Sequence, residues 1–188
     1  MGPKLMMVAL LFAVSMQSAA QALSKYEQFE IKGEDLVWQN TYPFEGSADS
    51  LRSTVVRMLK SKFFTFNVIR NEKGYNGEIK HYKVNCKRYD RTYLNTPRMY
   101  WDGEWTGKFI VELETRAYRV TIYALYFDTV QKSTDYFRTE KEVRGRYLDA
   151  VSKRNRASFR KDVLSDLTLM GVSLREEFDV RNTVAVEN

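Results

Sequence analysis

Apolar positions along the chain switch between a helical period and a strand period. The first helical series consists of Leu51, Val55, Met58, Leu59 and Phe63. It follows polar N-cap residues at 47–49, so the spacing predicts an amphipathic helix through about residue 62. Residues 36–42 are rich in strand formers and are followed by Pro43, which predicts a strand directly before this helix.

The middle of the chain alternates apolar and polar residues, as strands with one buried face do. Aromatic and β-branched residues at 63–69 predict a second strand, and the alternation over 78–89 predicts a third. Residues 105–114 and 118–127 predict the clearest hairpin of the chain, with its bend near 115–117. We therefore expect an antiparallel sheet of about five strands.

Beyond Thr129 the helical period returns. Its apolar stripe consists of Val143, Tyr147, Val151, Phe159, Val163, Leu167 and Met170. The gap around Asn155 predicts either one interrupted helix or two. Gly171 is the expected end of the helical region, because glycine is common just past a helix C-terminus, and residues 172–188 are expected to form a loose tail.

The first 22 residues follow a separate pattern. Lys4 precedes a short apolar run over 5–14, and small residues then offer cleavage sites after Ala20 or Ala22. The run is shorter than the ~20 apolar residues that a membrane helix needs, so we expect a removed secretory signal peptide over 1–22 rather than an anchor. Residues 23–171 are then expected to form one domain, exported to the periplasm or the cell surface.

Basic charge is concentrated in one segment of the chain. The sequence has 30 Lys and Arg against 24 Asp and Glu, and loss of Lys4 with the signal peptide leaves 29 against 24, or +5. Residues 138–161 contain nine basic and three acidic residues, a local excess of +6. Such a run is either a solvated helix face or a contact surface for an anionic partner. The candidate contact residues are Arg144, Arg146, Lys153, Arg154, Arg156, Arg160 and Lys161.

A long aromatic-rich loop is predicted over 90–103, just before the hairpin. Its rings are interleaved with arginines, and Arg98, Tyr100 and Trp101 are the candidate contact residues. The rings either fold back to cover the sheet or form an exposed surface that binds a partner. Their exposure distinguishes these two interpretations.

Residues suited to catalysis are few. His81 is the only histidine, which excludes a metal site built on several histidines, and Cys86 is the only cysteine, which excludes an intramolecular disulfide. Their odd separation in a regular strand directs the two side chains to opposite faces, against a thiolate–imidazole pair. Glu112 and Glu114 share a strand face and could serve a glycoside hydrolase, but such a pair is more typical of the solvated side of a hairpin.

The predicted elements follow the order strand, helix, four strands and helix. Together with the Gly-x-Ile segment at 77–79 and a hairpin whose second strand begins Ala117-Tyr-Arg-Val-Thr, this order resembles a family of exported Bacteroidetes proteins of unknown function with a TATA-binding-protein-like (TBP-like) fold. The resemblance spans about residues 36–130. It implies an α+β fold with helices packed on one face of a curved antiparallel sheet, which the periodicities also favour. It implies no activity.

We therefore expect an exported, non-enzymatic binding or structural module of the bacterial cell envelope. The expected partner is an envelope protein or an anionic envelope component, contacted through the basic helical region and the aromatic loop. We expect no cofactor, no metal, no nucleic-acid partner and no transmembrane segment after signal cleavage, and the oligomeric state stays open. The alternative is a carboxylate-based hydrolase of envelope glycans, for which Glu112 and Glu114 must line a concave pocket.

Overall fold

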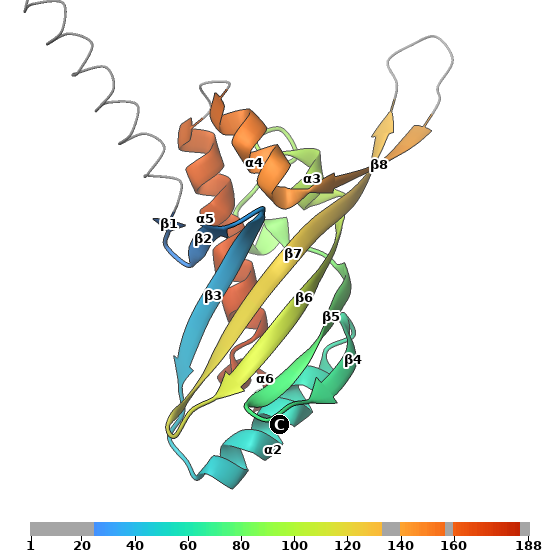
Figure 1. Cartoon of the computed structure of the whole chain (residues 1–188). Helices are drawn as coiled ribbons and strands as arrows, with labels where there is room; N and C mark the ends of the chain where they lie inside the picture. Colours follow the sequence, from blue (N-terminus) through green and yellow to red (C-terminus); the bar gives the residue numbers. More distant parts are fainter. Residues whose placement is uncertain (1–24, 133–139, 157–159, 185–188) are drawn as a thin grey trace, which may run out of the picture.

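Figure 1 shows the computed structural model, which describes residues 25–132, 140–156 and 160–184. The signal peptide expected over 1–22 lies outside these residues. Within them, no helix combines the length and the apolar character needed to cross a membrane. The described chain forms one sheet and several helices, which bury their apolar side chains in a single hydrophobic core.

In the described part of the chain, eight antiparallel strands form the sheet. They are β1 Lys25–Tyr26, β2 Phe29–Lys32, β3 Asp35–Pro43, β4 Thr65–Arg70, β5 Gly74–Tyr82, β6 Glu104–Leu113, β7 Ala117–Lys132 and β8 Glu140–Arg146. Their order is β1-β2-β3-β7-β6-β5-β4, and β8 pairs with the part of β7 beyond β3. The long β7 is therefore the centre of the sheet, since it pairs with β3, β6 and β8.

The described helices pack on one face of this sheet. They are α2 Ala48–Ser61, the 3₁₀ helix η1 Cys86–Tyr89, α3 Arg98–Trp101, α4 Tyr147–Arg156, α5 Arg160–Glu177 and α6 Val180–Val184. In Figure 1, α5 runs behind the sheet and α2 lies across its lower end. The face of the sheet turned toward the viewer carries none of these helices. The sheet thus has one covered face and one uncovered face.

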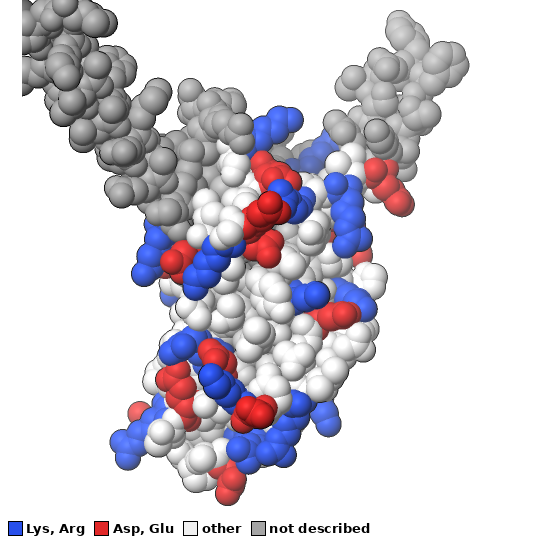
Figure 2. All heavy atoms as spheres, viewed as in Figure 1, with Lys and Arg blue, Asp and Glu red and all other residues white. Residues whose placement is uncertain are grey.

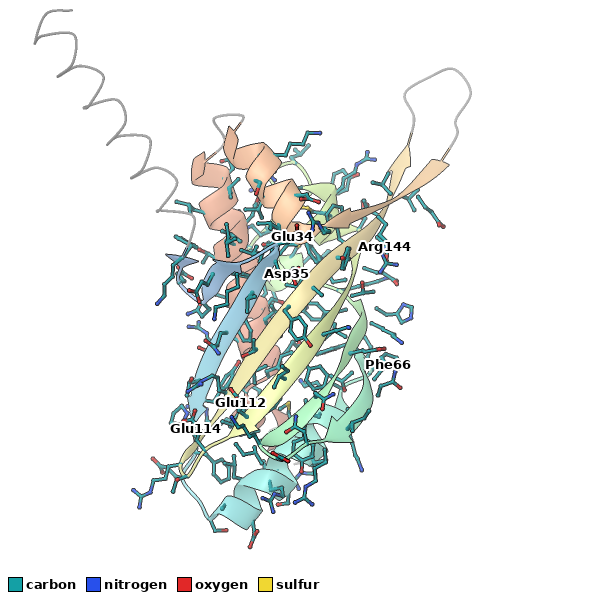
Figure 3. All side chains as sticks on the ribbon, in the orientation of Figure 1. Glu34, Asp35, Phe66, Glu112, Glu114 and Arg144 are labelled. Atoms are coloured by element: carbon teal, nitrogen blue, oxygen red, sulfur yellow. The ribbon has the colours of Figure 1, made fainter. Side chains whose placement is uncertain are left out.

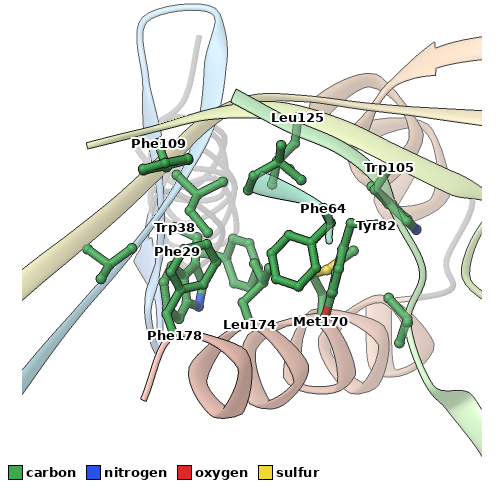
Figure 4. Close-up of a cluster of buried hydrophobic side chains, with 14 of the residues drawn as sticks. Phe29, Trp38, Phe64, Tyr82, Trp105, Phe109, Leu125, Met170, Leu174 and Phe178 are labelled. Atoms are coloured by element: carbon green, nitrogen blue, oxygen red, sulfur yellow. The ribbon is translucent and has the colours of Figure 1, made fainter. Parts of the chain in front are cut away.

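The hydrophobic core lies between α5 and the covered face of the sheet (Figure 4). Trp38, Trp105 and Phe109 point into it from the strands and have no exposed surface. Met170 and Leu174 face them from α5 and are equally buried. Aromatic residues of the strands therefore supply much of the apolar surface that this helix covers.

The strand count is larger than the expected five. The strand over 36–42, the helix through residue 62 and the hairpin over 105–127 are confirmed by β3, α2 and the β6–β7 pair. The strands β1 and β2 were not predicted, and β8 replaces the expected start of a helix. Val143 is the only large apolar residue of β8, which is extended because its backbone pairs with the far end of β7.

The segment expected to be a loose C-terminal tail forms part of the core. α5 continues past Gly171, so the expected helix end at this residue is wrong. A Cβ on Gly171 would lie 3.3 Å from the side chain of Gln28 and 3.4 Å from that of Phe29, so this glycine allows close packing of α5 on β2. Further along, Phe178 is fully buried, and its carbonyl oxygen accepts a hydrogen bond from the Tyr118 hydroxyl at 2.8 Å.

Ser47 caps α2, as the polar residues at 47–49 predict. Its Oγ accepts a hydrogen bond from the Ser50 N–H at 3.2 Å. Replacing Ser47 by alanine is expected to lower the free energy of unfolding by about 1 kcal/mol, measured by urea denaturation. Ser53→Ala on the same helix is the control, because the Ser53 hydroxyl only donates to the Ser50 carbonyl oxygen within the helix. Equal losses in the two variants would contradict the capping role of Ser47.

Candidate functional site

Three neighbouring strand pairs of the sheet are interrupted by bulges. Register shifts occur in the β4–β5, β5–β6 and β6–β7 pairs. One residue of positive φ accompanies each shift: Asn67 at 50°, His81 at 57° and Ala124 at 50°. Such a backbone costs about 1–3 kcal/mol in a residue other than glycine, and bulges are frequent beside functional sites. The aligned bulges therefore mark a candidate site on the sheet.

The uncovered face of the sheet is hollowed at two of these bulges, those of the β5–β6 and β6–β7 pairs. The depression has a volume of about 530 Å³. Its lining residues are Glu78, Ile79, Lys80, His81, Thr106, Gly107, Lys108, Ala124, Tyr126, Asp128 and Arg144. They come from four adjacent strands, β5, β6, β7 and β8. Figure 3 shows the uncovered face, with Arg144 labelled on it. We call this surface the bulge depression.

Charges of both signs lie in and beside the bulge depression. Lys80 forms an ion pair with Glu78 at 2.6 Å, and this hydrogen bond and the lysine charge lower the pKa of the Glu78 carboxyl. Beside it, His81 contacts Glu104 at 2.8 Å, and hydrogen bonds from His81 and Lys83 lower the pKa of Glu104. Figure 2 shows the same mixture, with blue and red side chains around a largely white centre of this face.

Arg144 closes the far side of the bulge depression. Its guanidinium lies 5.3 Å from the centre of the Tyr126 ring and donates a hydrogen bond to the Thr106 hydroxyl at 3.3 Å. Asp128 lies 3.9 Å from the same guanidinium. The arginine is therefore held over an aromatic ring that is itself only half-buried. The surface combines a ring, a hydroxyl and charges of both signs.

Comparisons with known proteins identify a fold but no activity. No protein-family model matches the chain, and no curated protein matches it. Among solved structures, the chain is similar to a TBP-like protein from Parabacteroides distasonis, with a TM-score of 0.52 over 82% of this chain and 97% of that chain. The chain has a TBP-like fold. The sequence identity is 14%, so the likeness concerns the fold alone.

The TBP-like fold separates the basic residues that the sequence places in one helical region. Arg144 and Arg146 lie on β8, whereas Lys153 and Arg154 lie on α4. Arg146 pairs with Asp149 at 2.9 Å and with Glu34 at 3.7 Å. Arg154 turns inward to pair with the buried Asp166 at 2.8 Å. The expected single helical surface is therefore wrong for Arg144, Arg146 and Arg154, and of these three Arg144 alone lines the bulge depression.

The remaining basic candidates divide into two groups. Lys153 is exposed on α4. The second group consists of Arg156 at the end of α4 and of Arg160 and Lys161 at the start of α5. Only the backbone of these three residues is described, and their side chains are not. The contact role of this group stays a prediction.

The aromatic loop of the TBP-like fold is packed against the core in its second half, whereas Tyr93 and Leu94 in its first half are exposed. Tyr100 is 1% exposed, and its hydroxyl donates a hydrogen bond to the Tyr147 hydroxyl at 2.9 Å. A contact role for Tyr100 is therefore wrong, because this ring belongs to the core. Trp101 is half-buried against Tyr93, over which the Arg98 guanidinium lies at 5.9 Å. The loop also contains the short helix α3, and η1 replaces the end of the strand expected over 78–89; the sequence indicated neither helix.

The carboxylates of the hydrolase hypothesis lie elsewhere on the uncovered face. Glu112 and Glu114 line a second hollow of about 360 Å³, together with arginines of neighbouring elements. Both contact the guanidinium of Arg119, at 3.6 Å and 2.6 Å. A substrate in this hollow would have to displace that ion-paired cluster before either carboxylate could act.

His81 and Cys86 do not meet. His81 is exposed beside Glu104, whereas the Cys86 thiol is buried and donates to the Tyr100 carbonyl oxygen at 3.3 Å. Burial raises the pKa of this thiol, which disfavours the reactive thiolate. Across residues 25–132, 140–156 and 160–184, no cluster of His, Cys, Asp and Glu could hold a metal ion.

Sequence reasoning missed most of the bulge depression. Lys80, Lys108 and Tyr126 were not among the candidate residues, because each occupies the polar face of an ordinary-looking strand. One local signal was present: Gly107 interrupts the alternation of β6, and an isolated glycine within a strand often marks a bulge.

Proposed function

We propose that this protein is an exported, non-enzymatic binding module of the bacterial cell envelope that contacts a partner protein through the bulge depression. The single observation that carries the proposal is a sheet with one uncovered face that is hollowed at the bulges of the β5–β6 and β6–β7 pairs. Concave surfaces with a few converging polar groups are the usual form of binding sites. The envelope location rests on the signal peptide expected over 1–22.

A protein partner fits this surface better than a polyanion does. The lining contains three cationic side chains, Lys80, Lys108 and Arg144, against the acids Glu78 and Asp128. The excess of one positive charge is small, whereas aromatic and arginine side chains beside charges of both signs are typical of protein interfaces. The partner is therefore expected to present complementary charges of both signs around an apolar or hydroxyl-bearing centre.

The hydrolase alternative has less support in the geometry. Its two carboxylates share one guanidinium, and the bulges lie at a different level of the sheet. Glycoside hydrolysis needs one carboxyl group as an acid and a second as a base or nucleophile, so two carboxylates that bind the same arginine are poorly prepared for these separate roles.

The proposal is tested by capture of envelope proteins with the mature chain, starting at residue 23, at low and at high salt. Lys108→Glu in the bulge depression is expected to weaken capture of a discrete partner about tenfold. Lys153→Glu is the matched control, because it makes the same charge change at another exposed lysine, on α4. This control is expected to leave the capture unchanged.

Two results would contradict the proposal. Loss of capture in Lys153→Glu, with Lys108→Glu unaffected, would move the contact to the helical region. Salt-labile retention of many polyanions, with no discrete partner, would indicate an anionic surface as the ligand. Thermal unfolding of both variants checks that each retains the fold.

A further inference from the structure

Strand β4 is a terminal strand of the sheet, and no described segment lies beyond it in Figure 1. Large apolar side chains are exposed here: Phe66 and Ile69 have 38% and 59% of their surface exposed, and Phe63 just before the strand has 77%. Natural edge strands usually carry charges or proline that prevent pairing with other chains, yet Arg70 is the only charged residue of β4. The edge therefore has the features of a pairing surface.

The bulge in β4 brings both apolar side chains to the same face of the sheet. Phe66 pairs with Glu78, and Ile69 pairs with Asn76, which is two residues from Glu78 on β5. Residues two apart on a strand share a face, so Phe66 and Ile69 both lie on the uncovered face, where Figure 3 labels Phe66. In a regular strand their odd spacing would place them on opposite faces.

The backbone of β4 directs hydrogen-bonding groups away from β5 near both ends. Asn71 and Phe64 each form a backbone hydrogen bond with β5, at 3.0 Å and 2.9 Å. Hydrogen-bonded and non-hydrogen-bonded pairs alternate in an antiparallel ladder, so the adjacent pairs, which contain Arg70 and Thr65, are non-hydrogen-bonded. The carbonyl groups of Arg70 and Thr65 and the N–H of Arg70 then point to the free edge.

We propose that β4 pairs antiparallel with β4 of a second copy of this chain, in the register that places Phe66 opposite Ile69 and Thr65 opposite Arg70. A twofold axis repeats each contact. Thr65 and Arg70 form the hydrogen-bonded pair through the outward N–H of Arg70 and the carbonyl oxygen of Thr65, since the Thr65 N–H already donates to the Lys62 carbonyl oxygen at 3.2 Å. Phe66 and Ile69 form the non-hydrogen-bonded pair, in which opposed side chains lie closest. Backbone direction and apolar contact thus require the same register.

The charges of β4 favour this register over others, and they favour a second copy of the chain as the pairing partner. A register centred on Arg70 would oppose two Arg70 side chains, and like charges directly opposite each other repel. In the proposed register each Arg70 faces the neutral Thr65, and each exposed apolar side chain of β4 gains an apolar neighbour. The strand is therefore complementary to itself. This inference does not depend on a partner protein at the bulge depression.

The register is tested by mixing Phe66→Cys and Ile69→Cys variants of the mature chain under mild oxidation. Opposed residues of a non-hydrogen-bonded pair have Cα atoms about 4.5 Å apart, within disulfide range. Because the bulge gives Phe66 and Ile69 the spacing of two regular residues, two copies of the same position are about 7 Å apart along the strands and about 8 Å apart in all, beyond disulfide range. The disulfide-linked dimer is expected in the mixture and in neither variant alone, and Cys86 is buried away from the oxidant. Equal cross-linking of a single variant would overturn the register.

Association itself is measured by sedimentation velocity over a range of concentrations. The unmodified mature chain is expected to form a dimer, and Phe66→Lys is expected to raise the dimer Kd about tenfold or more. Leu94→Lys is the control, because Leu94 is 98% exposed and lies outside β4. A chain that stays monomeric at about 0.1 mM, or a dimer that is insensitive to Phe66→Lys, would overturn the proposal.

Discussion

Replacing Phe178 by alanine is expected to lower the free energy of unfolding by about 3–5 kcal/mol. The ring has no exposed surface and lies edge-on or tilted against Phe64 and Phe109, each with centroids 6.0 Å away. Its removal leaves a cavity between α5 and the sheet and loosens the backbone that Tyr118 holds through two hydrogen bonds, at the Phe178 carbonyl oxygen and the Val180 N–H. Equilibrium urea denaturation at neutral pH measures the loss.

Phe63→Ala is the matched control for this experiment. It deletes the same ring from a position that is 77% exposed, so a loss below about 1 kcal/mol is expected. A similarly small loss in Phe178→Ala would mean that the residues after α5 are the loose tail that the sequence pattern indicates. A large loss of unfolding free energy in Phe178→Ala, with a small loss in Phe63→Ala, supports a core that includes the residues after α5.

The central hairpin could be predicted from sequence because its signal is local. In β6 and β7 one face is buried along most of the length, so apolar and polar residues alternate cleanly and the register follows from the turn. The helix α2 could be predicted equally well from the sequence, because its N-cap and its buried residues lie within one short segment. These buried residues are Leu51, Val55, Met58 and Leu59. Both elements satisfy the pattern rules without help from distant residues.

The strand β8 and the end of α5 depend on distant residues instead. β8 has little strand character of its own, and it forms because β7 extends past β3 and leaves its edge free to pair. Gly171 resembles a helix terminator by residue type, but its role is set by Gln28 and Phe29, more than 130 residues earlier, whose side chains a Cβ would crowd at 3.3 Å and 3.4 Å. Tertiary packing overrides local propensity at both places.

The candidate site was missed for a related reason. A charge count along the sequence cannot show that Arg154 is neutralised by Asp166 or that Arg146 contacts Glu34. A depression made by bulges in neighbouring strands is likewise a property of several strand pairs together, and no single strand reveals it. Gly107 was the one residue that marked the place locally.

The buried carboxyl group of Asp166 is expected to make the protein less stable as the pH rises from 4 to 7. Burial raises its pKa from 3.8 to about 6, although Arg154 at 2.8 Å and Arg91 act in the opposite direction. Between pH 4 and pH 6 the folded protein therefore holds a proton on Asp166 that the unfolded chain releases. The contribution of this proton to the free energy of unfolding is full below pH 4 and is lost as the pH rises through 6. A shift of this size corresponds to about 3 kcal/mol.

The experiment compares the wild-type protein with Asp166→Asn, using urea denaturation at several pH values between 4 and 7. Asparagine stays neutral, so the variant is expected to gain about 3 kcal/mol relative to the wild type between pH 4 and pH 7. Asp49→Asn on α2 is the control for net charge, since the Asp49 side chain is 97% exposed and lies on another helix, and it is expected to follow the wild-type curve. If Asp166→Asn instead loses stability relative to the wild type as the pH rises, then the ion pair with Arg154 outweighs burial and the carboxylate stabilises the fold.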